Sequence, residues 1–223
     1  MVASSLIVWA AIAQAATSTC YGTPSSGRLE NGVTLTDSGK NFKPYSGIGV
    51  KLGRTYVHSV VQQIVSKAYA QLEVTAPRKL FVYGESGFKL GGKFEPHRSH
   101  KNGLSVDFMV PVIDQYGESV TLPSNPINKF GYGIDFDKNG KFENLSIDFE
   151  AMAEHLYQLN LASKLMGAGL QLVIFDTQYL PKLFGTKRGS YLKSSILFMQ
   201  ISPWIRHDEH YHVDFKVACK SLV

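Results

Sequence analysis

The sequence predicts a single domain of the α+β class, in which helices flank a central antiparallel sheet. Segments with helical periodicity and segments with strand-like alternation follow one another without a regular strand–helix–strand rhythm. The chain has 223 residues, of which 44% are hydrophobic, enough for one compact unit with a sizeable core. We therefore expect residues 20–223 to form one domain.

The first 16 residues have the composition of a secretory signal peptide. An apolar stretch from Leu6 to Ala13 is followed by small residues that offer an A-x-A-like cleavage site near Ala13 to Ala16. The stretch is too short to span a bilayer, and no other segment is longer and equally apolar, so stable membrane insertion is not expected. No Lys or Arg precedes it, which leaves a buried N-terminal strand or helix as the alternative.

The elements of the first half follow from composition and periodicity. Residues 20–54 are rich in Gly, Ser, Thr and Pro and predict an irregular lead-in. Residues 55–73 carry apolar side chains at helical spacing and predict an amphipathic helix. Strands are expected at 80–83 and 104–110, and a loop at 84–93 follows the first of them.

The middle of the chain allows two interpretations. Residues 130–147 predict a hairpin around an Asn-Gly pair, the strongest two-residue hairpin signal. The pattern Asp135-x-Asp137-x-Asn139-Gly140 also matches the first half of a calcium loop. The twelfth position of that loop is Ser146 instead of Glu, so the hairpin is favoured over a calcium site.

The second half continues with mixed elements. Residues 148–166 predict the longest helix, with Asp148 as its N-cap and Gly167 as its stop. A buried strand is expected at 170–175, a short helix with proline in its first turn at 179–184, and an alternating strand at 212–217.

The two cysteines lie near opposite ends of the chain. In an oxidising compartment Cys20 and Cys219 would form a disulfide that ties the ends together, and two unrelated thiols are the alternative. The chain-entropy estimate for closing so long a loop is on the order of 4–5 kcal/mol.

Five of the seven histidines fall in two short windows. His97 and His100 form the first cluster, and His207, His210 and His212 form the second. A single histidine is usually a solvated or hydrogen-bonded side chain. Two clusters together indicate metal binding or acid–base chemistry.

The clusters offer three metal ligands. Gly103 permits a sharp turn between His100 and a strand that presents Asp107. Downstream, His210 and His212 share one face of an extended segment because strand side chains alternate. Two histidines and one aspartate that leave a fourth position for water form the arrangement of catalytic zinc sites. We therefore expect one zinc ion at the sheet and its adjoining loops.

Other functional classes are disfavoured. The formal charge is +5, but the basic residues are scattered and no aromatic–basic pattern of a nucleic-acid binder occurs. The chain lacks the helical H-E-x-x-H zinc motif, a phosphate-binding glycine loop and a G-x-S-x-G nucleophile frame. Nothing in the sequence indicates an oligomeric state.

The motif His100-x-x-Gly103-x-x-x-Asp107, followed far downstream by His210-x-His212, resembles the signature of the lysostaphin/D-Ala-D-Ala-peptidase/hedgehog metallopeptidases. The similarity is stronger to the penicillin-insensitive murein endopeptidases. It extends through Gly91-Gly92-Lys93-Phe94, His97, Pro203-Trp204 and His207, and it covers roughly residues 22–219.

The resemblance implies roles for the clustered residues. His100, Asp107 and His212 would bind zinc, His210 would act as base or oxyanion stabiliser, and His97 and His207 would be auxiliary histidines of the site. The implied reaction is hydrolysis of the D-alanyl–diaminopimelate cross-link of peptidoglycan in the periplasm. A metal-activated water leaves no serine for a β-lactam to acylate.

Two questions stay open at this stage. Glu209 could be the general base in place of His210, because related D,D-carboxypeptidases and dipeptidases place a glutamate three residues before their last metal-binding histidine. Strand alternation favours His210, which shares a face with His212. The reaction could also be that of a D,D-carboxypeptidase or dipeptidase, or the chain could be a non-catalytic zinc-binding cell-wall module.

Overall fold

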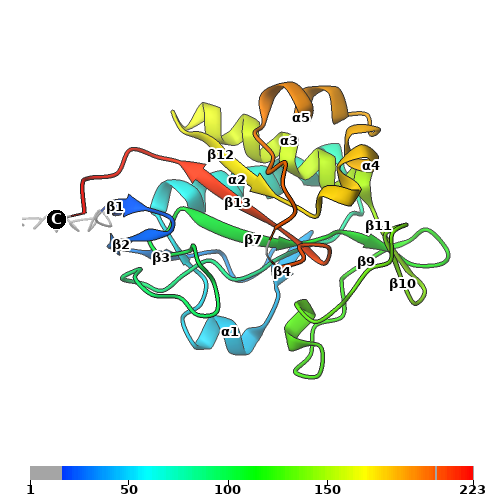
Figure 1. The fold of residues 1–223 in the computed structure, drawn as a ribbon, viewed down its shortest axis with the longest axis horizontal. Helices are drawn as coiled ribbons and strands as arrows, with labels where there is room; N and C mark the ends of the chain where they lie inside the picture. The colour runs from blue at the N-terminus through cyan, green and yellow to red at the C-terminus, as the bar shows by residue number, and fades with distance from the viewer. Residues whose placement is uncertain (1–16, 204, 223) are drawn as a thin grey trace, which may run out of the picture.

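The computed structural model describes residues 17–203 and 205–222 and has the expected α+β architecture in one domain (Figure 1). The signal peptide expected at residues 1–16 lies outside the described residues. No helix in the described part of the chain combines the length and the apolar character that crossing a bilayer requires.

A five-stranded sheet forms the centre of the fold. Its order is β12 (Gly169–Ile174), β13 (His210–Lys216), β7 (Ser105–Met109), β6 (Phe81–Tyr83) and β4 (Phe42–Pro44). All neighbours are antiparallel except β4 and β6, which are parallel. The expectation of a central antiparallel sheet is therefore confirmed, with one parallel strand at its edge.

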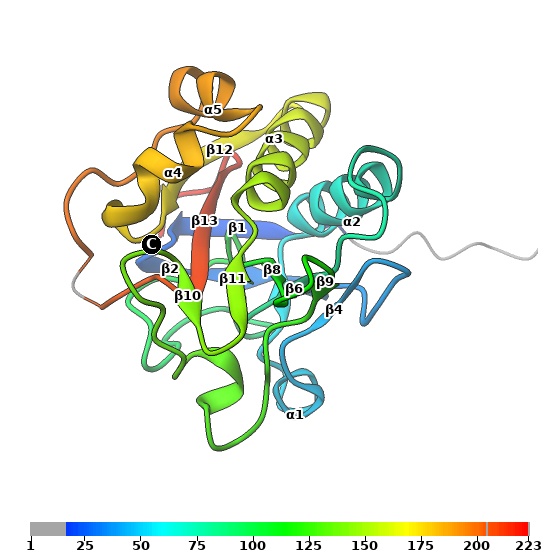
Figure 2. The same ribbon diagram turned by 90° about the vertical axis from the view of Figure 1, so that its right-hand side faces the viewer.

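Helices cover one face of this sheet (Figure 2). The two long helices, α2 (Ser59–Thr75) and α3 (Phe149–Leu165), lie side by side, and α4 (Leu180–Phe184) and α5 (Gly189–Ser195) pack against α3. Phe108 of β7 and Tyr211 of β13 point toward them, because both rings contact His155 of α3. Since strand side chains alternate, the residues before and after Tyr211 project from the opposite face.

Smaller elements surround the sheet. A second sheet has the order β10 (Lys141–Phe142), β11 (Leu145–Ile147), β8 (Val112–Ile113) and β9 (Ser119–Val120). Two ribbons pair β1 (Thr19–Thr23) with β2 (Ser26–Glu30) and β3 (Val33–Thr34) with β5 (Tyr56–Val57). The short helix α1 (Gly47–Lys51) and the 3₁₀ turns η1 (Lys129–Gly131) and η2 (Thr177–Tyr179) complete the described elements.

Most helix boundaries follow their local signals. The Asp148 side chain accepts the backbone N–H of Ala151 and caps α3, and Gly167 adopts the positive φ of a helix stop. Pro181 occupies the first turn of α4. The helix expected at 55–73 begins instead at Ser59, because Tyr56 and Val57 form β5 and His58 is the N-cap.

Two expectations about loops were wrong. Residues 20–54 are not an irregular lead-in, since they contain the antiparallel ribbon β1–β2, β3, β4 and α1. The hairpin of residues 130–147 turns between Phe142 and Leu145, not at Asn139-Gly140. Asp137 instead closes a preceding turn, where its Oδ1 accepts the backbone N–H groups of Asn139 and Lys141.

The expected disulfide is present. Cys20 and Cys219 are bonded across a sequence separation of 199 residues, with their Cα atoms 4.8 Å apart. Tyr21 also pairs with Lys220 next to this bond, so β1 and the C-terminal segment lie together.

Candidate metal centre

Pairing of β7 with β13 brings the two histidine clusters together. Asp107 and His212 are direct partners in this antiparallel register. Both project from the sheet face opposite the long helices, and both are almost fully buried, with exposed fractions of 0% and 3%. Residues more than a hundred positions apart therefore meet because a single strand pair aligns them.

His100 reaches the same point from the loop before β7. Its Nδ1–H donates to the carbonyl of Ser86 at 3.1 Å, which fixes the ring, and its Nε2 lies 3.3 Å from Oδ1 of Asp107. The turn after His100 requires glycine at position 103, where φ is +77° and a Cβ would lie 2.8 Å from the backbone nitrogen of His58.

The three predicted ligands therefore converge on one carboxylate oxygen. Oδ1 of Asp107 lies 3.3 Å from His100 Nε2 and 2.9 Å from His212 Nδ1. The two imidazole rings are 4.8 Å apart and nearly perpendicular. Two nitrogens and one oxygen around a common point are the donor set that zinc prefers.

His100 provides a test of whether a cation fits. Because its Nδ1 donates to Ser86, its Nε2 carries a lone pair that faces a carboxylate oxygen. This nitrogen is buried and has no hydrogen-bond partner among the described residues. Two electron-rich atoms this close repel each other unless a cation lies beside them, so the donor set fits a metal ion.

His212 leads to the same conclusion. Its Nε2–H donates to Asp214 at 2.9 Å, which directs Nδ1 toward Asp107. Burial alone would lower the pKa of His212, but Asp214 and Asp107 outweigh burial and raise the pKa to about 10. The site therefore attracts positive charge strongly, and a carboxylate behind a ligating imidazole is a common outer-sphere arrangement in metal sites.

His97 provides a further ligand atom. His97, His100 and Asp107 each offer a ligand atom within 4.8 Å of the other two, so these residues could also hold a metal ion. The Nε2 atom of His97 is 2.6 Å from Glu85 Oε2, and its Nδ1 is 3.8 Å from Asp107 Oδ2.

The second cluster borders the other side of Asp107. His210 Nδ1 lies 2.8 Å from Glu209 Oε1, and His210 Nε2 lies 4.0 Å from Asp107 Oδ2. His207 packs its ring 4.5 Å from that of His210 and is hydrogen-bonded through Nδ1 to the carbonyl of Ile205. Burial and the neighbouring His210 charge lower the pKa of His207 to about 4, so this imidazole is neutral at pH 7.

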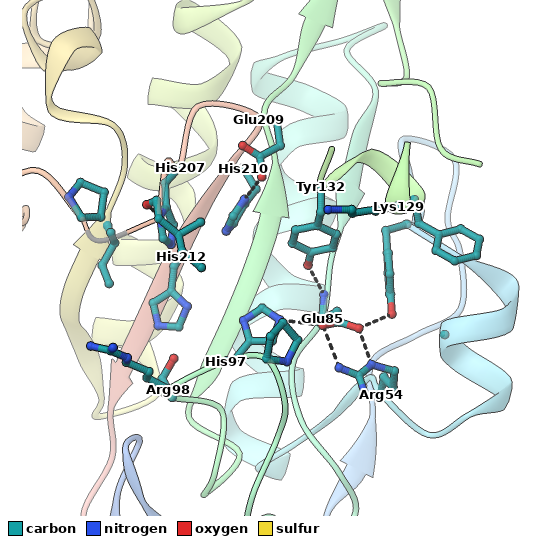
Figure 3. A pocket seen from close by; sticks show the side chains of 18 of the residues that line it. Arg54, Glu85, His97, Arg98, Lys129, Tyr132, His207, Glu209, His210 and His212 are labelled. Atoms are coloured by element: carbon teal, nitrogen blue, oxygen red, sulfur yellow. Dashed lines mark hydrogen bonds and ion pairs between the residues drawn. The ribbon is translucent and has the colours of Figure 1, made fainter. Parts of the chain in front are cut away.

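Sequence reasoning missed three residues of the site, and Glu85 is the first. Glu85 accepts hydrogen bonds from Arg54, Tyr45 and His97, as Figure 3 shows around its carboxylate. Burial alone would raise the pKa of Glu85, but the hydrogen bonds from His97 and Arg54 outweigh it and lower the pKa to about 2. Glu85 therefore stays ionised and holds His97 in one tautomer.

Tyr132 is the second missed residue and Asp214 the third. The Tyr132 hydroxyl donates to Asp107 Oδ2 at 3.1 Å and accepts the backbone N–H of Glu85 at 2.8 Å. Asp214 stands two positions after His212 on the same strand face, so alternation could have identified it. Tyr132 and Glu85 come from loops, whose sequences carry no such periodic signal.

An open cleft of about 830 Å³ leads to these residues. Figure 3 shows His97, His210 and His212 around its inner end, with Lys129 and Arg98 also on its wall. Exposed apolar side chains line it as well, contributed by α1, its C-cap and the segment before His207: Ile48, Leu52, Ile201 and Ile205. The cleft is large enough for a short peptide.

Comparison of the chain with models of known protein families and with curated proteins found no match.

Proposed function

We propose that the protein is a zinc-dependent peptidase that hydrolyses the D-alanyl–diaminopimelate cross-links of peptidoglycan. The observation that carries the proposal is the convergence of His100 Nε2, Asp107 Oδ1 and His212 Nδ1, of which His212 lines an open cleft. The resemblance of these residues to the motif of murein endopeptidases supplies the substrate class. The disulfide is compatible with an extracytoplasmic compartment, and we propose the periplasm.

Zinc bound by these residues would supply a Lewis acid that polarises the scissile carbonyl and lowers the pKa of water. Asp214 and the Ser86 carbonyl keep His212 and His100 in the tautomers that direct their lone pairs at the ion. Tyr132 holds the second oxygen of Asp107, so that Oδ1 stays directed at the two histidines.

His210 fits the role of general base better than Glu209. Its Nδ1–H is held by Glu209, so its Nε2 carries the free lone pair near Asp107. Burial alone would lower the pKa of His210, but the Glu209 and Asp107 charges outweigh burial and raise it. His210 accepts the proton of the attacking water and returns it to the leaving amine, while Glu209 stabilises the imidazolium.

The cleft wall matches the substrate in two ways. The apolar side chains of Ile48, Leu52 and Ile201 suit the methyl groups of alanine. Lys129 and Arg98 carry positive charge, which suits the carboxylates of wall peptides.

A muropeptide digest paired with metal analysis tests the proposal. The full chain should carry one tightly bound zinc ion and convert cross-linked muropeptide dimers into monomers, with or without a β-lactam. Asp107→Ala should lose metal and activity together. Asp37→Ala, an exposed aspartate on the surface, is the matched control and should retain both.

Product masses separate the related reactions, because release of a single terminal D-alanine would indicate a D,D-carboxypeptidase. Full activity after exhaustive chelation, or full activity of Asp107→Ala, would rule out the metallopeptidase mechanism. Bound zinc without any new amine termini would indicate a non-catalytic wall-binding module.

A further inference from the structure

The two oxygens of Asp107 face different sets of side chains. Oδ1 is directed at His100 and His212, the ligands of the proposed zinc site. Oδ2 lies 3.8 Å from His97 Nδ1 and 4.0 Å from His210 Nε2, and it accepts a hydrogen bond from Tyr132 at 3.1 Å. Two imidazoles that are not among the three ligands of the proposed zinc site therefore lie near the second oxygen.

Both of these imidazoles present a lone pair to Oδ2. Glu85 accepts the Nε2–H of His97, which leaves Nδ1 unprotonated, and Glu209 accepts the Nδ1–H of His210, which leaves Nε2 unprotonated. Neither nitrogen hydrogen-bonds to Asp107, since 3.8 and 4.0 Å exceed hydrogen-bond length. Two imidazole nitrogens therefore lie within 4.0 Å of one carboxylate oxygen without a hydrogen bond to it.

The spacing fits a metal ion. Ligand atoms that each lie about 2.0–2.2 Å from one zinc ion are roughly 3–4 Å apart. The two nitrogen-to-oxygen distances at Oδ2 fall in this range. Tyr132 occupies one lone pair of Oδ2, and a carboxylate oxygen has a second one available for a cation.

The charges around the site exceed what one divalent ion balances. Four buried or nearly buried carboxylates stand behind or between the histidines, namely Glu85, Asp107, Glu209 and Asp214. The guanidinium of Arg54 offsets one of them through its pairing with Glu85. The remaining three negative units exceed the charge of one divalent ion by about one unit, so the site still attracts a second cation once the first is bound.

We propose that a second divalent cation binds between Asp107 Oδ2, His97 Nδ1 and His210 Nε2, with Asp107 bridging the two ions. This second site is weaker than the first, because its ligands are spaced more widely and Tyr132 shares the bridging oxygen. Bridged ions in two-metal sites lie about 3.5–4 Å apart, and this is the separation we expect.

The effect on activity rests on the proposed function. Occupation of the second site takes the lone pair of His210 Nε2, the atom that must accept a proton from water. Excess zinc therefore inhibits the enzyme, and the inhibition follows the occupancy of the second site.

Zinc titration of the metal-free full chain by calorimetry, with anomalous diffraction from crystals grown in excess zinc, tests the site. Wild type should bind two ions in separable steps, with the second ion beside His97. His97→Ala should weaken the second step at least ~10-fold and leave the first in place. His58→Ala, which removes an imidazole outside the cleft, should keep both steps.

The other possible results separate a failure of the second site from a failure of the proposed function. One ion up to millimolar zinc, or a second ion that His97→Ala binds as tightly as wild type does, would overturn the second site while leaving the proposed function intact. Absence of any tight ion would overturn the proposed metal centre and the second site together. Inhibition by excess zinc that persists unchanged in His97→Ala would show that it arises elsewhere.

Discussion

Asp107 shows how a fully buried carboxylate is kept charged. Burial alone would raise its pKa, but the electrostatic interactions with His100 and His210 outweigh burial and lower the pKa well below its usual range. Each surrounding histidine has its outward nitrogen held by a second acceptor, such as Ser86, Glu85 or Asp214. The ring orientations are therefore fixed before any ligand arrives, which lowers the free-energy cost of binding an ion.

A histidine on the other face of the sheet is kept neutral instead of supporting a charged site. His155 of α3 is fully buried among the rings of Tyr69, Phe81 and Phe108 and shares a hydrogen bond with the Tyr211 hydroxyl. Burial lowers its pKa to about 3, so it is neutral in the folded protein at pH 7. Its function is packing.

His155 should make the protein sensitive to acid. The unfolded chain takes up a proton on this residue below about pH 6.5, whereas the folded chain does so only near pH 3. Folding stability is therefore complete above pH 6.5 and is lost as the pH falls, by about 3 kcal/mol at pH 4. Urea unfolding at pH 7 and pH 4 should show His155→Phe losing less stability than wild type between the two.

Tyr211→Phe is the matched control. It removes the same hydrogen bond but keeps the imidazole, so it should retain the wild-type pH dependence while being less stable by about 1 kcal/mol. If His155→Phe loses as much stability as wild type on acidification, another group controls the acid sensitivity.

At the scale of single residues, the sequence identified the candidate site residues whose spacing along the chain forms a pattern. The histidine clusters and Asp107 stand out because their positions relative to a turn and a strand repeat a known arrangement of ligands. Glu85 and Tyr132 approach the site through loops 22 and 25 positions away from Asp107 in sequence. Their contacts depend on tertiary folding, which no local pattern encodes.

At the scale of elements, the turn between His100 and β7 determines the geometry of the site. Gly103 and Gly92 both adopt a positive φ, of +77° and +82°. A Cβ at position 103 would lie 2.6 Å from a Leu29 methyl group and 2.8 Å from the His58 nitrogen, whereas a Cβ at position 92 would meet nothing within 4 Å. A residue with a Cβ would therefore meet the same backbone strain at both positions, but steric crowding only at position 103.

This difference gives a matched pair of variants. Gly103→Ala should lower the free energy of unfolding by about 1–3 kcal/mol more than Gly92→Ala, because only the former forces neighbouring atoms apart. Urea unfolding of both variants measures the difference. Gly103→Ala should also weaken binding of the proposed zinc ion, since His100 would shift. Equal stability of the two variants would mean that the turn relaxes without cost.

The strand pair that forms the centre was more predictable than the elements at its margins. Alternation placed β7 and β13 to within two residues at each end, and the Asp148 cap and Gly167 stop placed α3. The β1–β2 ribbon escaped detection because Gly, Ser and Thr dominate it, and its stability comes from distant partners. Gly91 pairs with Arg28, and Lys220 pairs with Tyr21.

At the scale of the whole molecule, the disulfide should contribute a large share of stability. The double variant Cys20→Ser/Cys219→Ser removes a covalent loop of nearly the full length of the domain. The chain-entropy estimate predicts a loss of up to about 5 kcal/mol, because the unfolded chain gains conformational freedom. Urea unfolding without reductant measures the loss.

Wild type unfolded with reductant is the control and should match the double variant. A loss below about 1 kcal/mol would show that the unfolded chain already keeps its ends close, or that the bond strains the fold.

Because the disulfide holds the two ends of the domain together, the order of segments along the chain could change while the arrangement of the site stays the same. Residues 20 and 219 are neighbours in space, and β1 already pairs with the segment at Lys220. A short peptide linker could therefore close the polypeptide into a ring, and the ring could be opened at an exposed turn such as that around Gly117. In such a circular permutant His212 would precede His100 in the gene, yet both would still meet at Asp107.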